Sequence, residues 1–185
     1  MVADLEQGFR YPVAMGHINA AADGEEAGAD VDVDSLDTGY LAQFAGHAWN
    51  EKVLEALHKK GHPKARTSHG FVFQHLMTGP MSTSSLAVRM GISQQAASKQ
   101  VAALMRLGYV SRIAAPNDQR LKLLKLTKKA EDAIATGRAI RKDLEAKLKR
   151  KVGADVVDAT RALLAAMLGD DIEAAVKGRK VKATT

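Results

Sequence analysis

The residues best suited to chemistry in this sequence surround a short turn, PNDQ, at residues 116–119. Arg112 precedes the turn, and Arg120, Lys122 and Lys125 follow it within a stretch rich in leucine. Cationic side chains on a narrow loop suit phosphate oxygens, and an arginine at the tip suits the negative potential of a DNA minor groove. The sequence therefore predicts a nucleic-acid contact at this turn.

Asp118 lies inside this basic turn, where phosphates would repel a bare carboxylate. An ion pair with Arg120 would neutralise the carboxylate and fix the direction of the guanidinium. Proline, asparagine and aspartate are also residues that favour tight turns. The two interpretations are compatible, and we expect Asp118 to aim Arg120 while the preceding residues shape the turn.

A second polar group falls in the first half of a predicted helix, QQAASKQVAALMRL, which Ser93 caps and Gly108 ends. Glutamine can pair with adenine through two hydrogen bonds, and lysine reaches guanine or phosphate. The side chains expected to face outward toward DNA are Ser93, Gln94, Gln95, Ser98 and Lys99. An ordinary solvated helix face would have a similar composition, so this group alone leaves both interpretations open.

These residues need a helix-turn-helix and a β-hairpin to position them. Ser82 opens a short helix, STSSLAVRM, which Gly91 closes before the helix that begins after Ser93. Tyr109–Ala114 and Leu121–Leu126 are predicted strands on either side of the turn. The predicted fold class is therefore mainly α with a small β-hairpin wing, which is a winged helix-turn-helix domain.

Long helices are predicted on both sides of this winged helix. Apolar residues at helical spacing indicate a first helix over residues 35–59, and Thr67 or Ser68 is predicted to cap a second helix. After the hairpin, Thr127 caps another long helix, and Gly153 separates that helix from a final one.

Charge divides the chain into an acidic N-terminal segment and a basic body. Residues 1–38 hold nine acidic residues and one basic residue, a net charge of −8, whereas the remainder holds 26 basic and 12 acidic residues, a net charge of +14. We expect residues 1–34 to form a mostly disordered tail. A body this basic attracts polyanions such as nucleic acid, although a membrane surface or a solubility adaptation would fit the charge alone.

Composition also narrows the class of protein. The 185 residues suit one domain, and the absence of cysteine excludes disulfides and thiolate metal sites. No apolar run has the length of a membrane span and no secretion signal is present, so we expect a cytoplasmic protein without a membrane partner.

Residue patterns typical of catalytic sites are not recognised either. No nucleophile and base pair, phosphate-binding glycine loop or paired carboxylates can be recognised, so neither an enzyme nor a cofactor is predicted. His58 and His62 are four residues apart, but Gly61 and Pro63 break the helix that would align them, and no metal site is predicted there.

The combined segments resemble a known family. From about Ser68 to Ala130 the sequence looks like the winged-helix domain of MarR-family transcription regulators, and SLAVRMGISQQAASKQVAALMRLGYVSR is similar to the family's helix-turn-helix. The family's wing signature is present at Pro116, Asp118, Arg120, Leu126 and Thr127. With the flanking helices the resemblance spans about residues 36–175. Gln119 stands where the family often has a second arginine.

The resemblance implies a homodimer that binds palindromic double-stranded DNA and acts as a repressor released by a small molecule. It implies one MarR-like domain over residues 35–178, with dimerisation helices at 35–62 and 128–178 around a DNA-binding region at 66–127, and a basic frayed end at 179–185. Asp118 would orient the wing contact that Arg120 supplies. The alternative is a nucleoid-type protein that binds DNA with little sequence preference and has no ligand switch.

The resemblance also implies a pocket for a small aromatic or phenolic effector between the dimerisation helices and the winged domain. The residues that could line it are Tyr40, Phe44, His47, His69 and Phe71. Packing in the core or at a dimer interface is the commoner role for any one of them.

Overall fold

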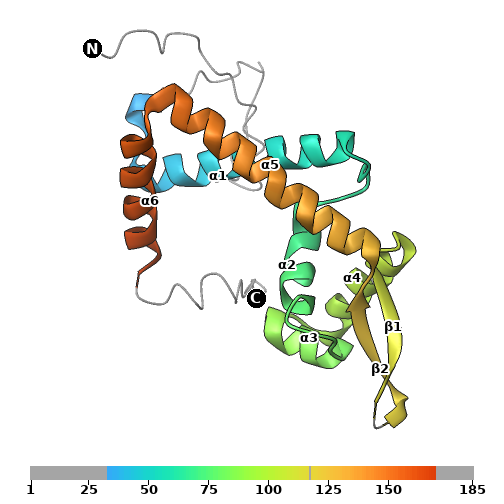
Figure 1. Cartoon of the computed structure of the whole chain (residues 1–185). Coiled ribbons are helices and arrows are strands. Elements are labelled where there is room, and N and C mark those ends of the chain that lie inside the picture. Colours follow the sequence, from blue (N-terminus) through green and yellow to red (C-terminus); the bar gives the residue numbers. More distant parts are fainter. Residues whose placement is uncertain (1–32, 117, 170–185) are drawn as a thin grey trace, which may run out of the picture. The chain divides into compact units, whose positions relative to one another are not determined.

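The computed structural model describes residues 33–116 and 118–169, so most of the predicted acidic tail and all of the predicted basic end lie outside the described residues. The described residues divide into two compact units, one that ends at Ala45 and one that begins at Gly46. The described part of the chain begins with a 3₁₀ turn, η1 (Val33–Ser35). The elements that follow are labelled in Figure 1: α1 (Thr38–Lys59), α2 (Thr67–Leu76), α3 (Thr83–Met90), α4 (Gln94–Arg106), β1 (Val110–Ala115), β2 (Asp118–Leu126), α5 (Lys128–Val152) and α6 (Ala154–Leu168). The 3₁₀ turn η1 includes the last two residues of the predicted tail.

The helix-turn-helix is confirmed together with its capping residues. Ser82 caps α3, because its side-chain oxygen accepts a hydrogen bond of 3.1 Å from the Ser85 backbone N–H. Gly91 ends that helix in the left-handed conformation, with φ of 64°. Ser93 caps α4 in the same way, by accepting a 3.1 Å bond from the Ala96 N–H. These local signals begin and end both helices where the sequence predicts. The predicted cap of α2 is wrong, because Arg66 is its N-cap residue and Thr67 is already the first residue of the helix.

The hairpin is confirmed, with strands that reach closer to the turn than predicted. β1 and β2 pair antiparallel, and their register shifts between Ala114 and Ala115, so that Ala115 lies opposite Asp118. The second strand therefore begins at Asp118 and not at Leu121. Near the base of the hairpin, Met81 exchanges two backbone hydrogen bonds with Leu124, of 3.3 and 2.8 Å. This bridge ties the segment before α3 to the wing.

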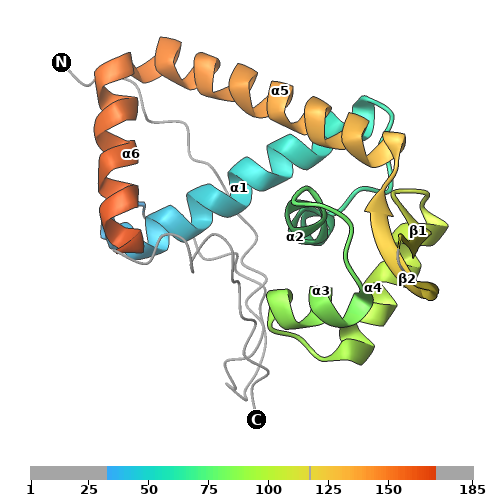
Figure 2. The same ribbon diagram turned by 60° about the horizontal axis from the view of Figure 1, so that its bottom comes forward.

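One apolar core holds the winged helix together. Figure 2 shows α2, α3, α4 and the hairpin gathered at one end of α5. Each of these four parts contributes fully buried side chains to the core. The largest of them are Tyr109, Leu86, Leu104, Leu124, Val72 and Val101. Burying a large apolar side chain contributes about 1.5–3 kcal/mol, so this cluster is a main stabiliser of the arrangement.

Thr127 begins α5 and also connects that helix to the end of α4. Its hydroxyl donates a 2.7 Å hydrogen bond to the Gly108 carbonyl and accepts a 3.4 Å bond from the Ala130 N–H. Gly153, with φ of 95°, separates α5 from α6 as predicted. An ion pair of 3.0 Å between Arg161 and Glu145 joins the last two helices. Among the described residues, the helices are all too short or too polar to cross a membrane.

Candidate nucleic-acid interface and ligand cavity

Helix α4 has one buried face and one exposed polar face. Ala97, Val101 and Leu104 are at most 1% exposed and pack into the core. Their helical spacing forces the other side of the first half of the helix outward. The side chains on that outer side are all exposed, as predicted: Ser93, Gln94, Gln95, Ser98 and Lys99. An exposed row of amides, hydroxyls and one ammonium group can form hydrogen bonds with base edges.

The wing carries exposed cations on a backbone that the core holds at its base. Arg112, Arg120 and Lys122 are exposed. Arg112 lies opposite Leu124, and Lys122 lies opposite Ala114. Residues two apart on a strand share a face, so Arg112 and Lys122 continue the face on which Leu124 is buried. The structure therefore places both cations beyond the core on one side of the hairpin.

Asp118 makes a different contact from the one that the sequence suggests. Its carboxylate accepts a 2.8 Å hydrogen bond from the Arg120 backbone N–H. Among the described residues, no ion pair joins the Asp118 carboxylate to the Arg120 guanidinium. A short carboxylate reaches the backbone two residues on without ordering a long side chain, which costs less conformational entropy. Asp118 thus shapes the turn and leaves Arg120 exposed.

The buried His62 is the centre of a polar network that the sequence did not predict. His62 is 3% exposed, its Nδ1 lies 3.2 Å from the Tyr109 hydroxyl, and its Nε2 lies 3.0 Å from Asp132 Oδ2. Burial raises the pKa of the Tyr109 phenol, which therefore stays protonated. The hydroxyl can then donate to Nδ1 while Nε2–H donates to the Asp132 carboxylate. The partners are 47 and 70 residues from His62 in the chain, so no spacing signal could have revealed them.

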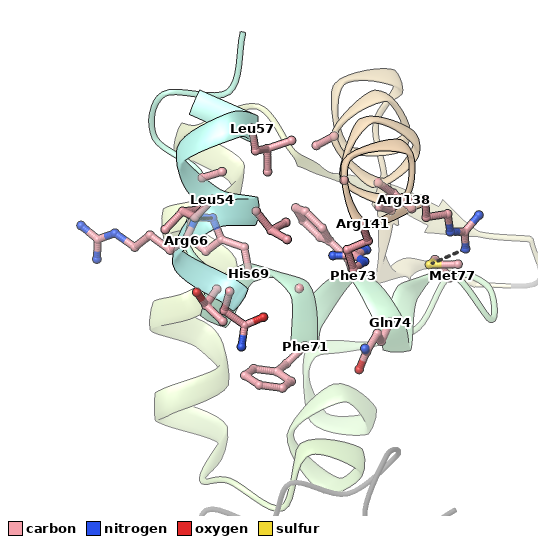
Figure 3. A pocket seen from close by; sticks show the side chains of 18 residues that line it. Leu54, Leu57, Arg66, His69, Phe71, Phe73, Gln74, Met77, Arg138 and Arg141 are labelled. Carbon is pink, nitrogen blue, oxygen red and sulfur yellow. Dashed lines mark hydrogen bonds between the residues drawn. The ribbon is translucent and has the colours of Figure 1, made fainter. Parts of the chain in front are cut away.

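A cavity of about 640 Å³ lies between the second half of α1, α2 and α5. Its apolar wall includes Val53, Leu54, Leu57, Phe71, Phe73 and Ile134, and its polar lining includes Asn50, Arg66, His69, Gln74, Arg138 and Arg141. Figure 3 shows Leu54 and Leu57 on the α1 side, Arg138 and Arg141 on the α5 side, and the Arg66 guanidinium pointing away from the other labelled side chains. The lining contains three arginines and no aspartate or glutamate. Such a cavity favours an apolar molecule that carries an anionic group.

The predicted effector residues separate into two groups. His69 and Phe71 line the cavity, whereas His47 is not among its lining residues. Tyr40 and Phe44 belong to the first compact unit, where their rings stack with centroids 6.3 Å apart. The helical spacing of Asn50, Val53, Leu54 and Leu57 was the available signal for the α1 side of the cavity.

Two charged side chains of α5 differ in how they are held. The Arg138 guanidinium donates to the Met77 sulfur at 3.8 Å. Arg141, among the described residues, has no hydrogen-bond or ion-pair partner, and its guanidinium lies 3.7 Å from the position of a Cβ at Gly137.

His69, on the α2 side of the cavity, accepts a 3.2 Å hydrogen bond at Nδ1 from the Arg66 backbone N–H. Burial, followed by the charge of Arg66, lowers the pKa of its imidazole. His69 is therefore a neutral donor through Nε2, and Arg141 is the cation best placed to receive an anion.

Comparisons with known proteins agree with this architecture. Residues 67–121 match the model of a family described as the MarR family. No curated protein matches the chain. The solved YusO protein from Bacillus subtilis is 20% identical with a TM-score of 0.58, and the match covers 76% of this chain and 99% of that one. MepR, a transcription regulator of the Staphylococcus aureus multidrug efflux pump MepA, is 18% identical with a TM-score of 0.57, covering 72% and 97%.

A third similar structure is a mutant of S. aureus MepR bound to an oligodeoxyribonucleotide, which is 18% identical with a TM-score of 0.54, covering 72% of this chain and 97% of that one. At these identities the likeness establishes the fold. The predicted winged helix-turn-helix fold, mainly α with a small β wing, is confirmed.

Proposed function

We propose that this chain is a winged helix-turn-helix transcription regulator of the MarR type, which binds palindromic DNA sequence-specifically as a homodimer and represses until a small anionic molecule fills the cavity. The observation that carries the proposal is the pairing of two exposed surfaces on one core. The polar face of α4 suits base edges in a major groove, and the basic wing suits phosphates and the adjacent minor groove.

The last helix supports a dimer. Large apolar side chains on α6 are 40–54% exposed: Val156, Leu163, Leu164, Met167 and Leu168. An apolar row of this kind on one helix is typical of a surface that a partner covers. A second copy of the chain would bury the same row from both subunits around a two-fold axis. Two winged helices related by that axis would then read the two halves of a palindrome.

The cavity supports an aromatic acid as the ligand. Its volume of about 640 Å³ lies within the usual range for small-molecule sites. A ring would contact Leu54 and Phe73, and a carboxylate would be drawn to Arg141, whose guanidinium lacks a partner among the described residues.

Selection of binding sites from a random DNA library tests the DNA-binding part of this proposal. A sequence-specific dimer is expected to enrich a palindrome and to bind it about 10³-fold or more tightly than random DNA. A nucleoid-type protein would enrich no consensus and would bind both duplexes alike, with the same steep salt dependence. Absence of a consensus, with equal binding of both duplexes, would refute the proposal of sequence-specific binding.

Tryptophan fluorescence tests the ligand part. Trp49 is the only tryptophan in the chain. It precedes Asn50, which lines the cavity. Titration with benzoate and 4-hydroxybenzoate is expected to change its emission and to weaken binding to the selected duplex. Arg141→Gln removes the charge while keeping length and polarity, and it is expected to weaken binding of both probes. Equal binding of the uncharged benzamide would refute a role for the carboxylate.

A further inference from the structure

Tyr109 lies directly behind the wall of the cavity. Its ring centroid is 5.5 Å from that of Phe73 and 6.2 Å from that of His69, and both of these residues line the cavity. The tyrosine itself is 1% exposed and is not part of the lining. A molecule that displaces the Phe73 or His69 ring must therefore push on Tyr109, because a packed interior leaves little free space to absorb the movement.

The backbone of Tyr109 lies between the two surfaces proposed to bind DNA. Its N–H donates a 2.9 Å hydrogen bond to the Leu104 carbonyl in α4, and β1 begins at the next residue, Val110. Its carbonyl accepts a 3.0 Å bond from the Thr127 N–H at the start of α5. A shift at residue 109 would therefore change the angle between α4 and the wing.

The far end of the Tyr109 side chain is anchored. The hydroxyl is 3.2 Å from His62, which in turn is 3.0 Å from Asp132 on α5. The Lys129 ammonium lies 4.9 Å from the ring centroid and adds a cation–π contact on one face. Because the Tyr109 hydroxyl is held in place, a push on the ring from the cavity side rotates the side chain about its hydroxyl end. The movement then passes to the backbone of residue 109.

We infer that Tyr109, anchored through its hydroxyl to His62 and Asp132, is the positioning residue that couples occupancy of the cavity to the geometry of α4 and the wing. This inference rests on the proposed function, because it assigns a route for the proposed ligand switch. A tyrosine that only fills the core would affect stability and DNA affinity without changing the response to an occupied cavity. The two roles therefore differ in a double-mutant cycle.

A side chain attached inside the cavity serves as the occupant, so that no ligand needs to be known. Gly137 lines the cavity, and a Cβ there would make only ordinary contacts of 3.7–4.0 Å with Arg141. Gly137→Leu fills part of the cavity, and Gly137→Ala is the matched control that adds one methyl group. Each is combined with Tyr109→Phe, which keeps the ring and removes the anchor. Affinity is measured for the duplex that the wild-type protein selects from a random library.

Gly137→Leu is expected to weaken binding of this duplex by about fivefold or more, a typical allosteric coupling, while Gly137→Ala changes it by less than about twofold. In the Tyr109→Phe background, the loss caused by leucine should shrink to less than about twofold. An equal loss in both backgrounds, or no loss from leucine in either, overturns the inference. If the wild-type protein selects no site, the proposed function fails instead, and the two failures are thereby distinguished.

Asp132→Ala provides a second route to the same test if Tyr109→Phe does not fold. The Asp132 side chain is 69% exposed, so its loss releases the His62 end of the anchor without opening the core. It is expected to reduce the effect of Gly137→Leu in the same way as Tyr109→Phe. Asp143→Ala, which removes an exposed carboxylate elsewhere on α5, should leave that effect unchanged. A full leucine effect in the Asp132→Ala protein contradicts the coupling role.

Discussion

Arg120→Ala separates a contact of the wing with DNA from the folding of the wing. The Asp118 carboxylate bonds to the backbone N–H of residue 120, and that hydrogen bond survives the substitution. The Arg120 side chain is exposed, so its removal leaves the core intact. We therefore expect the variant to unfold at the temperature of the wild-type protein and to lose only its interaction with DNA.

The size of that loss follows from counterion release. Each phosphate contact contributes about 0.9 to the slope of log K against log salt, so two wings contribute about 1.8. The counterion contribution vanishes at about 1 M salt, and 0.1 M salt lies one decade below that concentration. The loss of affinity at 0.1 M salt is therefore about eightfold per wing and about 60-fold for a dimer. The slope itself should fall by about 1.8, and both quantities can be measured by fluorescence anisotropy with the selected duplex at several salt concentrations.

Arg150→Ala is the matched control, because it removes an exposed arginine near the other end of α5. It should leave the slope unchanged. A wild-type affinity and slope in the Arg120→Ala protein would refute the proposed contact between the wing and DNA, because the substitution removes the only side chain assigned to the tip of the wing.

Further predictions concern α4, the start of α5, the cavity and the tail. Gln95→Ala should change the consensus at one position of each half-site and leave affinity for random DNA within about twofold, since amides read bases; repeated site selection would show this. Thr127→Ala removes a helix cap and a hydrogen bond to the end of α4, so the free energy of unfolding should fall by about 1–2 kcal/mol in urea, whereas Thr160→Ala, on exposed α6, should change it by less than about 0.5 kcal/mol. Burial and a nearby arginine lower the pKa of His69, so the unfolded chain binds the proton more readily and stability is lost as pH falls through about 6.5. His69→Asn should flatten that decline in thermal unfolding curves between pH 7.5 and 5.5. Deletion of residues 1–34 removes a net charge of −7 and should strengthen binding of random DNA while the protein still elutes as a dimer in gel filtration; elution as a monomer would show a structural role for this segment.

Several features of the fold could be predicted because their causes are local. Ser82, Ser93 and Thr127 each accept a hydrogen bond from the backbone N–H three residues on, and the hydroxyl needs only its own helix for this contact. Gly91 adopts a positive φ for a similarly local reason. The outward face of α4 follows from the apolar spacing of its buried residues. The exposure of the α4 residues that we propose to face DNA could therefore be predicted from the sequence.

The contact that Asp118 makes could not be predicted from the neighbouring residues alone. An aspartate two residues before an arginine can pair with the guanidinium or with the backbone N–H, and both contacts satisfy the carboxylate. The choice depends on the register of the hairpin, in which Asp118 begins β2 opposite Ala115. That register comes from the pairing of two strands and is absent from the spacing of residues along one of them.

The sequence by itself determined the residues that cap α3, α4 and α5, which face of α4 is polar and that cations gather around the turn of the wing. These properties follow from hydrogen bonds and periodicities within a few residues. Only the tertiary structure decided that His62 meets Tyr109 and Asp132, and that Arg141 shares a cavity with Leu54 and Phe73. The physical reason is that such contacts depend on how whole helices pack, and packing is set by many weak apolar contacts between residues far apart in the chain.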